Sequence, residues 1–203
     1  MKLELILIRH GATAGNAERR YTGQTLNQPL SERGKKELAD RKARGRYPQT
    51  DTLYVSPLGR CVETARLLYP MLVPVSLPSL AELDFGSFEG KTYEQLKDDP
   101  SYRKWIETAG MTAPPGGESG AEFAQRLLGA MRQIADDAAK RNIRSAAVIT
   151  HGGCIMTLLS KLHPLAESGA GGVDMYDFQA PNGGGYRVEM DTETLRFDQI
   201  RAL

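Results

Sequence analysis

The chain lacks the features that mark secreted, membrane-spanning and zinc-binding proteins. Its 203 residues include only two cysteines, Cys61 and Cys154, too few for a disulfide framework and without the spacing of zinc ligands. No apolar run approaches the roughly 20 residues that cross a bilayer. The N-terminal apolar stretch runs into charged residues and has no small-residue cleavage site, so a signal peptide is not expected. We therefore expect a reduced, cytoplasmic protein.

A strong charge of either sign is also missing. The formal net charge is +1, which gives no overall attraction to nucleic acid or to a membrane surface. Any anion must therefore be bound by a local cluster of basic side chains. With 40% hydrophobic residues, no internal repeat and no long linker, the chain predicts one enzyme-sized domain over residues 1–203. We expect a small-molecule partner, neither nucleic acid nor membrane, and a homodimer stays open.

Segments typical of strands and helices alternate along the chain. The predicted strands are residues 3–8, 52–55, a short one near 73–77, the run from 145 up to His151, and a hairpin over 186–200. The predicted helices are one capped by Ser31 and ending near Arg44, one with Ser56 as N-cap and Pro57 as its first residue, a region over 92–108 broken near Pro100, and a long helix opened by the Ser119–Glu122 capping box. This alternation predicts an α/β fold, a three-layer sandwich with a mostly parallel central sheet and helices on both faces.

Two of these strands end in the same way, in "LILIRHG" and "AVITHGG". Each is an apolar run followed by a histidine and a glycine. The carboxyl ends of parallel strands lie at one edge of a sheet, where ligands bind in open α/β folds. We therefore expect His10 and His151 to face each other across a pocket. One histidine alone would more often be structural, but the matched pair favours a site.

Basic and amide side chains follow the same strands and suit a phosphate. Arg9 precedes His10, and Arg60 lies near the start of the helix that follows the strand over 52–55. Guanidinium groups match phosphate oxygens, and a helix N-terminus favours an anion. Asn16 adds a neutral donor from the first loop. The alternative for Arg60 is a solvated helix surface, which the strand–Ser-Pro–helix context argues against.

These groups suggest phosphoryl transfer through a histidine. A neutral imidazole nitrogen can attack phosphorus, and arginines with a second histidine can stabilise charge on the phosphoryl oxygens. A carboxylic acid must also protonate the leaving alcohol. Glu82, in the apolar turn "LAELDFG", is the candidate for that acid. Asp84 and Glu89 are rivals that composition alone does not exclude.

Four segments, "LIRHGATAGN", "SPLGRCVETA", "ELDFGSFEG" and "VITHGG", resemble the signature segments of the histidine phosphatase superfamily, in the expected order. The resemblance implies a phosphoglycerate-mutase-like fold with His10 as the nucleophile. It implies that Arg9, Arg60 and His151 form the rest of the phosphate pocket, with Asn16 as an additional contact. No metal or organic cofactor is implied.

The resemblance also bears on the acid and on the first loop. Glu82 lies four residues before Gly86, as the family's proton donor lies before its glycine, which favours it over Asp84. Substrate contacts are expected from three loop residues, Thr22, Gly23 and Gln24. Here the loop reads "GQTLNQPL", one residue longer than the family's Gly-x-x-Asp-x-Pro-Leu and with Asn27 in place of aspartate, so the positions of its residues near substrate stay open.

Within the superfamily the chain is most similar to the α-ribazole phosphatase branch. "YTGQT" lacks the tryptophan of the longer phosphoglycerate mutases, and "ELDFGSFEGKTYEQL", "RKWIE" and "PPGGES" resemble that branch. The resemblance implies a metal-independent phosphomonoester hydrolase with a small phosphorylated metabolite as substrate, α-ribazole 5′-phosphate being one candidate. Sugar-phosphate phosphatases share much of this pattern.

Three other functions are weighed against this hypothesis. A phosphoglycerate-mutase-type phosphoryl transferase would use the same histidine. A non-catalytic regulatory protein could keep the phosphate pocket, but it would not need an acid beside the nucleophile. A metallohydrolase using both histidines is disfavoured, because two arginines would repel a cation. For the two cysteines, an inert buried thiol is favoured over a redox role.

Overall fold

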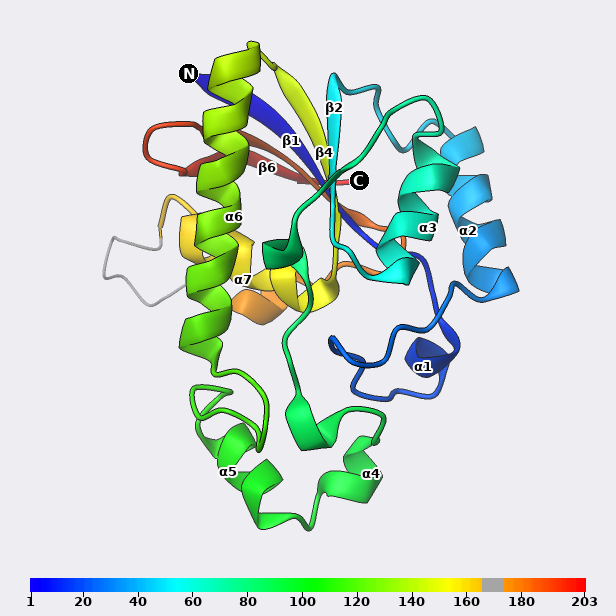
Figure 1. The fold of residues 1–203 in the computed structure, drawn as a ribbon, viewed down its shortest axis with the longest axis vertical. Coiled ribbons are helices and arrows are strands. Elements are labelled where there is room, and N and C mark those ends of the chain that lie inside the picture. The colour runs from blue at the N-terminus through cyan, green and yellow to red at the C-terminus, as the bar shows by residue number, and fades with distance from the viewer. Residues whose placement is uncertain (166–173) are drawn as a thin grey trace.

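A six-stranded sheet forms the centre of the computed structural model, which describes residues 1–165 and 174–203. The strand order is β3-β2-β4-β1-β5-β6 (Figure 1). The strands are β1 (Lys2–Arg9), β2 (Thr52–Val55), β3 (Val75–Ser76), β4 (Ser145–Thr150), β5 (Gly185–Asp191) and β6 (Phe197–Ala202). Neighbours from β3 to β1 pair in parallel, while β5 runs antiparallel to both β1 and β6. The mostly parallel sheet and the C-terminal hairpin are confirmed, although β3 is shorter than expected.

Helices cover both faces of the sheet, as predicted. Figure 1 shows α2 and α3 on one side and α6 and α7 on the other. The α-helices are α1 (Ala14–Ala17), α2 (Glu32–Ala43), α3 (Gly59–Leu68), α4 (Tyr93–Leu96), α5 (Pro100–Glu107), α6 (Gly120–Arg141) and α7 (Gly152–Leu162). Three short 3-10 helices are η1 (Pro78–Leu80), η2 (Gly86–Phe88) and η3 (Met175–Phe178). In the part of the chain described, no helix is long and apolar enough to cross a membrane.

Alternation along β1 divides the core into two layers. Leu5 and Leu7 pack into the cluster that contains the apolar face of α6, whereas Ile6 and Ile8 pack into the cluster under α2 and α3. All four side chains are fully buried. A strand covered on both faces needs apolar residues at every position, which explains why this run shows no polar alternation.

The long helix α6 follows its sequence signals closely. The Ser119 hydroxyl accepts from the Glu122 N–H and the Glu122 carboxylate accepts from the Ser119 N–H, so the predicted capping box is present. At the other end, Asn142 adopts the left-handed conformation and stops the helix. The apolar positions predicted to face the core are all buried: Phe123, Leu127, Met131 and Ile134.

The predicted start of α3 is wrong. Ser56 and Pro57 were expected as N-cap and first residue, but the helix begins at Gly59 with Leu58 as its N-cap. The Ser56 hydroxyl lies 2.8 Å from His151 Nε2 and accepts from the Leu58 N–H only at 3.5 Å, so its shorter bond is to the histidine. The Gly59 N–H instead donates to Asn27 Oδ1 at 2.6 Å. The asparagine that departs from the family pattern therefore fastens the first loop to α3.

The connecting segments that carry α1, α4 and α5 lie at one end of the molecule, beyond the carboxyl ends of the parallel strands (Figure 1). The helical region over 92–108 is broken before Pro100, as predicted. A third apolar cluster of Phe88, Leu96 and Tyr102 holds this part together. Tyr21 of the first loop packs against it, and its hydroxyl lies 2.7 Å from that of Tyr102. The loop after β1 is thus anchored to the segment around α4 and α5.

Shortening Leu127 to alanine should lower the free energy of unfolding by about 3 kcal/mol. Leu127 is fully buried at the centre of the α6 face, so the change leaves a cavity. Urea unfolding of Leu127→Ala beside Leu67→Ala measures the effect, since Leu67 is 41% exposed on α3. The Leu67 variant should change stability by less than about 0.5 kcal/mol. Equal effects would show that α6 does not form the core described.

Candidate active site

The pairing of β1 with β4 brings the two histidines together. Arg9 lies opposite Thr150 in the parallel register, and the His10 N–H donates to the Thr150 carbonyl at 3.0 Å. The rings of His10 and His151 then lie with their centroids 5.1 Å apart, nearly edge to face. His10 is 4% exposed and His151 is fully buried. The two matching strand ends therefore bring the two imidazole rings together.

One hydrogen bond fixes the tautomer of His10. Its Nδ1 lies 2.7 Å from the Gly11 carbonyl, which can only accept, so Nδ1 carries the proton. Burial, with the charges of Arg60 and Arg9 adding to it, lowers the pKa of His10 to about 3. The imidazole is therefore neutral at physiological pH, and its Nε2 keeps a lone pair, as a nucleophile requires.

His151 is held in the opposite tautomer. The Arg60 Nε–H donates to its Nδ1 at 3.3 Å, so the proton is on Nε2, which lies 2.8 Å from the Ser56 hydroxyl. The Cys61 sulfur lies 3.5 Å from the same Nε2. Burial, together with the nearby His10 and Arg60, lowers the pKa of His151 well below its ordinary value. Two neutral imidazoles thus lie side by side next to two arginines.

Arg60 is fully buried, so its predicted alternative as a solvated helix residue is wrong. Besides the bond to His151, its terminal nitrogens donate to the Leu26 carbonyl at 3.0 Å and the Gly23 carbonyl at 2.8 Å. A guanidinium has five N–H groups. These three bonds leave donors on both terminal nitrogens for an anion, apart from a longer 3.5 Å contact with the Thr22 carbonyl.

Arg9 shows a similar spare donor. One terminal nitrogen donates to the Ala180 carbonyl at 2.8 Å, which holds the side chain across the end of the sheet. Its Nε is buried and has no hydrogen-bond partner among the described residues. An unpaired buried N–H is costly, so this group is suited to an oxygen of a bound anion.

The first loop is arranged around Arg60 and not toward open solvent. Thr22 and Gly23 contribute their carbonyls to the guanidinium. The Gln24 side-chain amide lies 3.3 Å from a Glu118 carboxylate oxygen. The structure therefore brings Thr22 and Gly23 to the site through their backbone and turns the Gln24 amide to a carboxylate.

Three carboxylates in the segment after η1 have separate functions. Glu89 accepts four hydrogen bonds from residues 24–26, between 2.5 and 3.0 Å, and so fixes the first loop. Asp84 accepts from the Gly86 N–H at 2.9 Å and closes a local turn. Neither arrangement presents a proton to the histidines. Of the three carboxylates, Glu82 alone has neither task.

Glu82 is 8% exposed and lies against the start of α7. Its Oε2 accepts from the Gly153 N–H at 3.1 Å, and its Oε1 from the Leu83 N–H at 3.0 Å. A Cβ at Gly153 would stand 2.5 Å from Oε1, so the carboxylate can approach only because this residue is glycine. The charge of Glu82 also raises the pKa of Arg9 and Arg60, which burial lowers.

Asn16 is oriented by its neighbours. Its Oδ1 accepts from the Thr13 N–H at 3.0 Å, the Thr13 hydroxyl at 3.1 Å and the Asn182 side chain at 3.1 Å. The Asn182 amide also donates to the His10 carbonyl at 3.2 Å. Because the oxygen is occupied three times, the NH₂ group of Asn16 is the part left to donate to a ligand.

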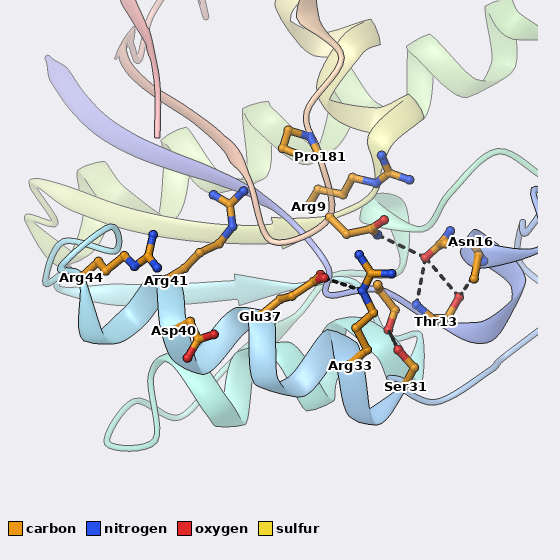
Figure 2. Close-up of a pocket in the computed structure, with 13 residues that line it drawn as sticks. Arg9, Thr13, Asn16, Ser31, Arg33, Glu37, Asp40, Arg41, Arg44 and Pro181 are labelled. Atoms are coloured by element: carbon orange, nitrogen blue, oxygen red, sulfur yellow. Dashed lines mark hydrogen bonds and ion pairs between the residues drawn. The ribbon is translucent and has the colours of Figure 1, made fainter.

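Two cavities flank this cluster and share Arg9, Asn16 and Asn182. The first, of about 560 Å³, lies along α2. Figure 2 shows its charged lining from that helix, including the Arg33–Glu37 pair at 2.7 Å. The second, of about 570 Å³, is lined by residues of the first loop, α4 and the segment before β5. His10 and His151 line neither cavity.

Comparison with known proteins identifies the family. The sequence matches the histidine phosphatase superfamily (branch 1) over residues 5–202. The chain belongs to this superfamily. It is 28% identical to the adenosylcobalamin/α-ribazole phosphatase of Escherichia coli K12, over 99% of this chain and 98% of the relative. The resemblance found in the four sequence segments is confirmed.

Two further similarities place the chain within the histidine phosphatases. It is 28% identical to a metal-independent phosphoserine phosphatase of Arabidopsis thaliana, over 82% of this chain and 71% of the relative. The structure is similar to that of the α-ribazole phosphatase from Shigella flexneri, with a TM-score of 0.80 and 25% identity over 98% of this chain and 95% of that one. The fold and the phosphatase class are therefore shared with this branch.

Sequence reasoning missed three residues that hold this histidine phosphatase site in place. Ser56 was assigned to a helix cap, Asn182 lies in a loop without a recognisable pattern, and Arg126 lies on the polar side of α6. Arg126 donates to the carbonyls of residues 79, 81 and 82 and pairs with Glu118. The segment that carries Glu82 is thereby tied to α6. Of the three, only Ser56 could have been predicted from the sequence as a site residue, because it directly follows a strand that ends at the sheet edge.

Both cysteines are buried thiols next to this site. Burial raises the pKa of Cys61 to about 12 and raises that of Cys154 well above its ordinary value. Because the thiolate is the reactive form, both groups are inert in the folded protein. The structural interpretation favoured from the sequence agrees with this environment.

The free energy of unfolding should fall as the pH drops below about 6.5, because the buried histidines stay neutral in the fold. The pKa of His10 is about 3 in the folded chain and near 6.5 in the unfolded chain. Between these values the unfolded chain binds a proton that the folded chain excludes, so protons favour unfolding. Each such histidine contributes about 1.4 kcal/mol per pH unit in this window.

Urea unfolding of the wild type and of His10→Gln between pH 7.5 and 4.5 measures this contribution. Glutamine does not titrate, so the free energy of unfolding of the variant should fall less steeply with decreasing pH than that of the wild type. The difference in slope should be about 1.4 kcal/mol per pH unit, the value for one proton. The carboxylates titrate in both proteins, so their contribution to the pH dependence of stability cancels when the two are compared. Equal slopes would show that His10 is protonated in the fold over this range.

Proposed function

We propose that this protein is a metal-independent phosphomonoester hydrolase that forms a phosphohistidine at His10. The observation that carries the proposal is the state of that imidazole. It is neutral, its Nδ1–H is bound to the Gly11 carbonyl, and its ring lies 5.1 Å from that of His151 and within the influence of the Arg60 and Arg9 charges. A neutral imidazole held in one tautomer beside anion donors is the form needed to attack phosphorus.

In the first step, His10 Nε2 attacks the phosphorus atom and the bond from phosphorus to the alcohol oxygen breaks. The leaving alkoxide takes a proton from the carboxylic acid of Glu82. In the second step, a water oxygen attacks the phosphohistidine while the Glu82 carboxylate takes a proton from that water. The bond between phosphorus and nitrogen breaks, inorganic phosphate forms, and His10 and Glu82 return to their first states.

The arginines stabilise the charge that spreads over the three non-bridging oxygens during transfer. Arg9 offers its unpaired Nε–H, and Arg60 offers its remaining terminal N–H groups. Neutral His151 accepts from the Arg60 Nε–H at Nδ1 and thereby holds this guanidinium in place for the phosphoryl oxygens.

Metal independence is part of the proposal and has two supports. Two buried guanidinium groups already supply positive charge where a metal ion would act, and they repel a cation. A relative 28% identical to this chain is named a metal-independent phosphoserine phosphatase. We also place the reaction in the cytoplasm, since both cysteines are unpaired thiols.

The proposed substrate is a small phosphorylated metabolite, with α-ribazole 5′-phosphate as the first compound to test. The support is the named activity of the Escherichia coli relative, which spans nearly all of this chain. The sequence pattern that this branch shares with sugar-phosphate phosphatases makes sugar phosphates the comparison set.

The phosphatase should hydrolyse p-nitrophenyl phosphate in excess EDTA, and His10→Ala should lower kcat by about 10⁴-fold or more. Wild type incubated with ³²P-labelled substrate and quenched in alkaline detergent should carry base-stable label that acid then releases, and the variant should lack it. Activity lost in EDTA and restored by a metal would contradict metal independence. Full activity in His10→Ala would contradict the nucleophile, and phosphate binding without turnover would indicate a binding protein.

Glu82→Gln should affect alkyl phosphates more than p-nitrophenyl phosphate. An alkoxide needs a proton to leave, whereas p-nitrophenolate leaves without one, so kcat/KM, which reports the first step alone, should fall about 10²- to 10⁴-fold for the alkyl ester only. The matched control is Asp84→Asn, which removes a rival carboxylate from the same segment. A similar loss of kcat/KM for both esters in Glu82→Gln, or a leaving-group effect on kcat/KM in Asp84→Asn, would contradict the assignment of the acid.

A further inference from the structure

The second cavity carries positive charge that nothing in its lining neutralises. Three arginines face it, together with two tyrosines and three amide side chains, and its lining includes no acidic residue. The lining residues are Arg9, Asn16, Arg19, Arg20, Tyr21, Tyr93, Gln179 and Asn182. Since Arg9 and Asn16 belong to the phosphate cluster, this cavity opens directly beside the atoms that would hold the phosphoryl group.

Of these arginines, Arg19 is the one that the fold does not use. The Arg20 guanidinium pairs with Glu18 and donates to the Gly90 carbonyl at 2.6 Å. Arg9 donates to the Ala180 carbonyl. The Arg19 side chain is exposed in the cavity, and within residues 1–165 and 174–203 it has neither an ion pair nor a hydrogen bond.

The backbone at Arg19 is also unfavourable for a side chain. α1 ends in a Schellman motif: the Arg20 N–H donates to the Gly15 carbonyl and the Arg19 N–H to the Asn16 carbonyl. This places Arg19 in the left-handed region, at φ 55°. Glycine is the usual residue at this position, because it has no Cβ to clash. The chain therefore carries an arginine where its own folding would favour glycine.

The first cavity differs in this respect. Its arginines on α2 are accompanied by Glu37 and Asp40, and Arg33 is paired with Glu37, as Figure 2 shows. Positive charge there is partly neutralised within the protein. The second cavity thus differs in having no acidic side chain in its lining beside Arg19.

We propose that Arg19 binds a second anionic group, a carboxylate or phosphate, on the leaving-alcohol part of the substrate. The inference rests on the proposed phosphatase function and names a substrate class for it. Tyr21 and Tyr93 form the aromatic wall against which the carbon skeleton between the two anions lies. Burial raises the pKa of Tyr21, so it stays neutral and does not repel the anion.

The test uses phosphate monoesters of ω-hydroxy acids of increasing chain length, each beside the matching ω-hydroxy amide ester. Members of a pair differ by one charge and hardly in shape. The measured quantity is the ratio of kcat/KM for the acid to that for the amide. At the length that reaches Arg19, the wild type should prefer the acid by about tenfold, the value of a charged hydrogen bond.

Three variants separate binding from folding. Arg19→Gly should bring the ratio close to one while raising Tm by about 3 °C, because it relieves the left-handed residue. Arg19→Lys should keep part of the preference, since it keeps the charge. Arg66→Ala removes an exposed arginine from α3 and should change neither the ratio nor Tm.

Each outcome decides between the two proposals. A wild-type ratio near one at every chain length, or an unchanged ratio in Arg19→Gly, would overturn the assignment of Arg19 and leave the phosphatase function standing. Hydrolysis of no ester by the wild type would overturn the phosphatase function, and the inference with it. An acid preference that only the Arg19 variants weaken supports both.

Discussion

The site depends on a buried positive charge without an anionic partner bonded to it. Arg60 is fully buried and its guanidinium stays charged, yet its hydrogen bonds go to two carbonyls and an imidazole. Arg9 adds a second guanidinium with an unpaired buried N–H. Burying charge without a counter-ion is costly, and under the proposed function a phosphate dianion would supply the missing charge. Burial, together with the charges of the arginines, keeps both histidines neutral, which is the state that the proposed mechanism requires of His10.

The surrounding polar contacts hold Arg60 and its neighbours in place. Glu89 fixes the first loop so that its carbonyls face Arg60, while Ser56 and Arg60 hold the two nitrogens of His151. Arg126 ties the segment before Glu82 to α6 through three carbonyls. Stability and catalysis are therefore linked, since a change in any of these contacts moves a group that would touch the substrate.

The sequence predicted the parts of this arrangement that depend on regular periodicity. Apolar runs ending in His10 and His151 located the strand ends, and the capping box at Ser119 located α6. The contacts of Asn182 in a loop and of Arg126 on α6 were not predictable, because both side chains bond to backbone carbonyls whose positions exist only in the folded chain. Ser56 shows the limit most clearly. Its position before Pro57 is typical of a helix cap, but a buried histidine nitrogen is the partner that the fold provides.

The three acidic residues of "AELDFGSFEG" show how one short segment acquires separate functions. Glu89 accepts from three backbone N–H groups and a hydroxyl of the first loop, and Asp84 accepts from the Gly86 N–H in its own turn. Glu82 accepts from the Leu83 and Gly153 N–H groups, at 3.0 and 3.1 Å, and lies beside a glycine that lets it approach α7. A proton donor must exchange its proton during each turnover, so it cannot also be the main support of a loop. The division of work among these carboxylates therefore follows from the part of the chain that each one contacts.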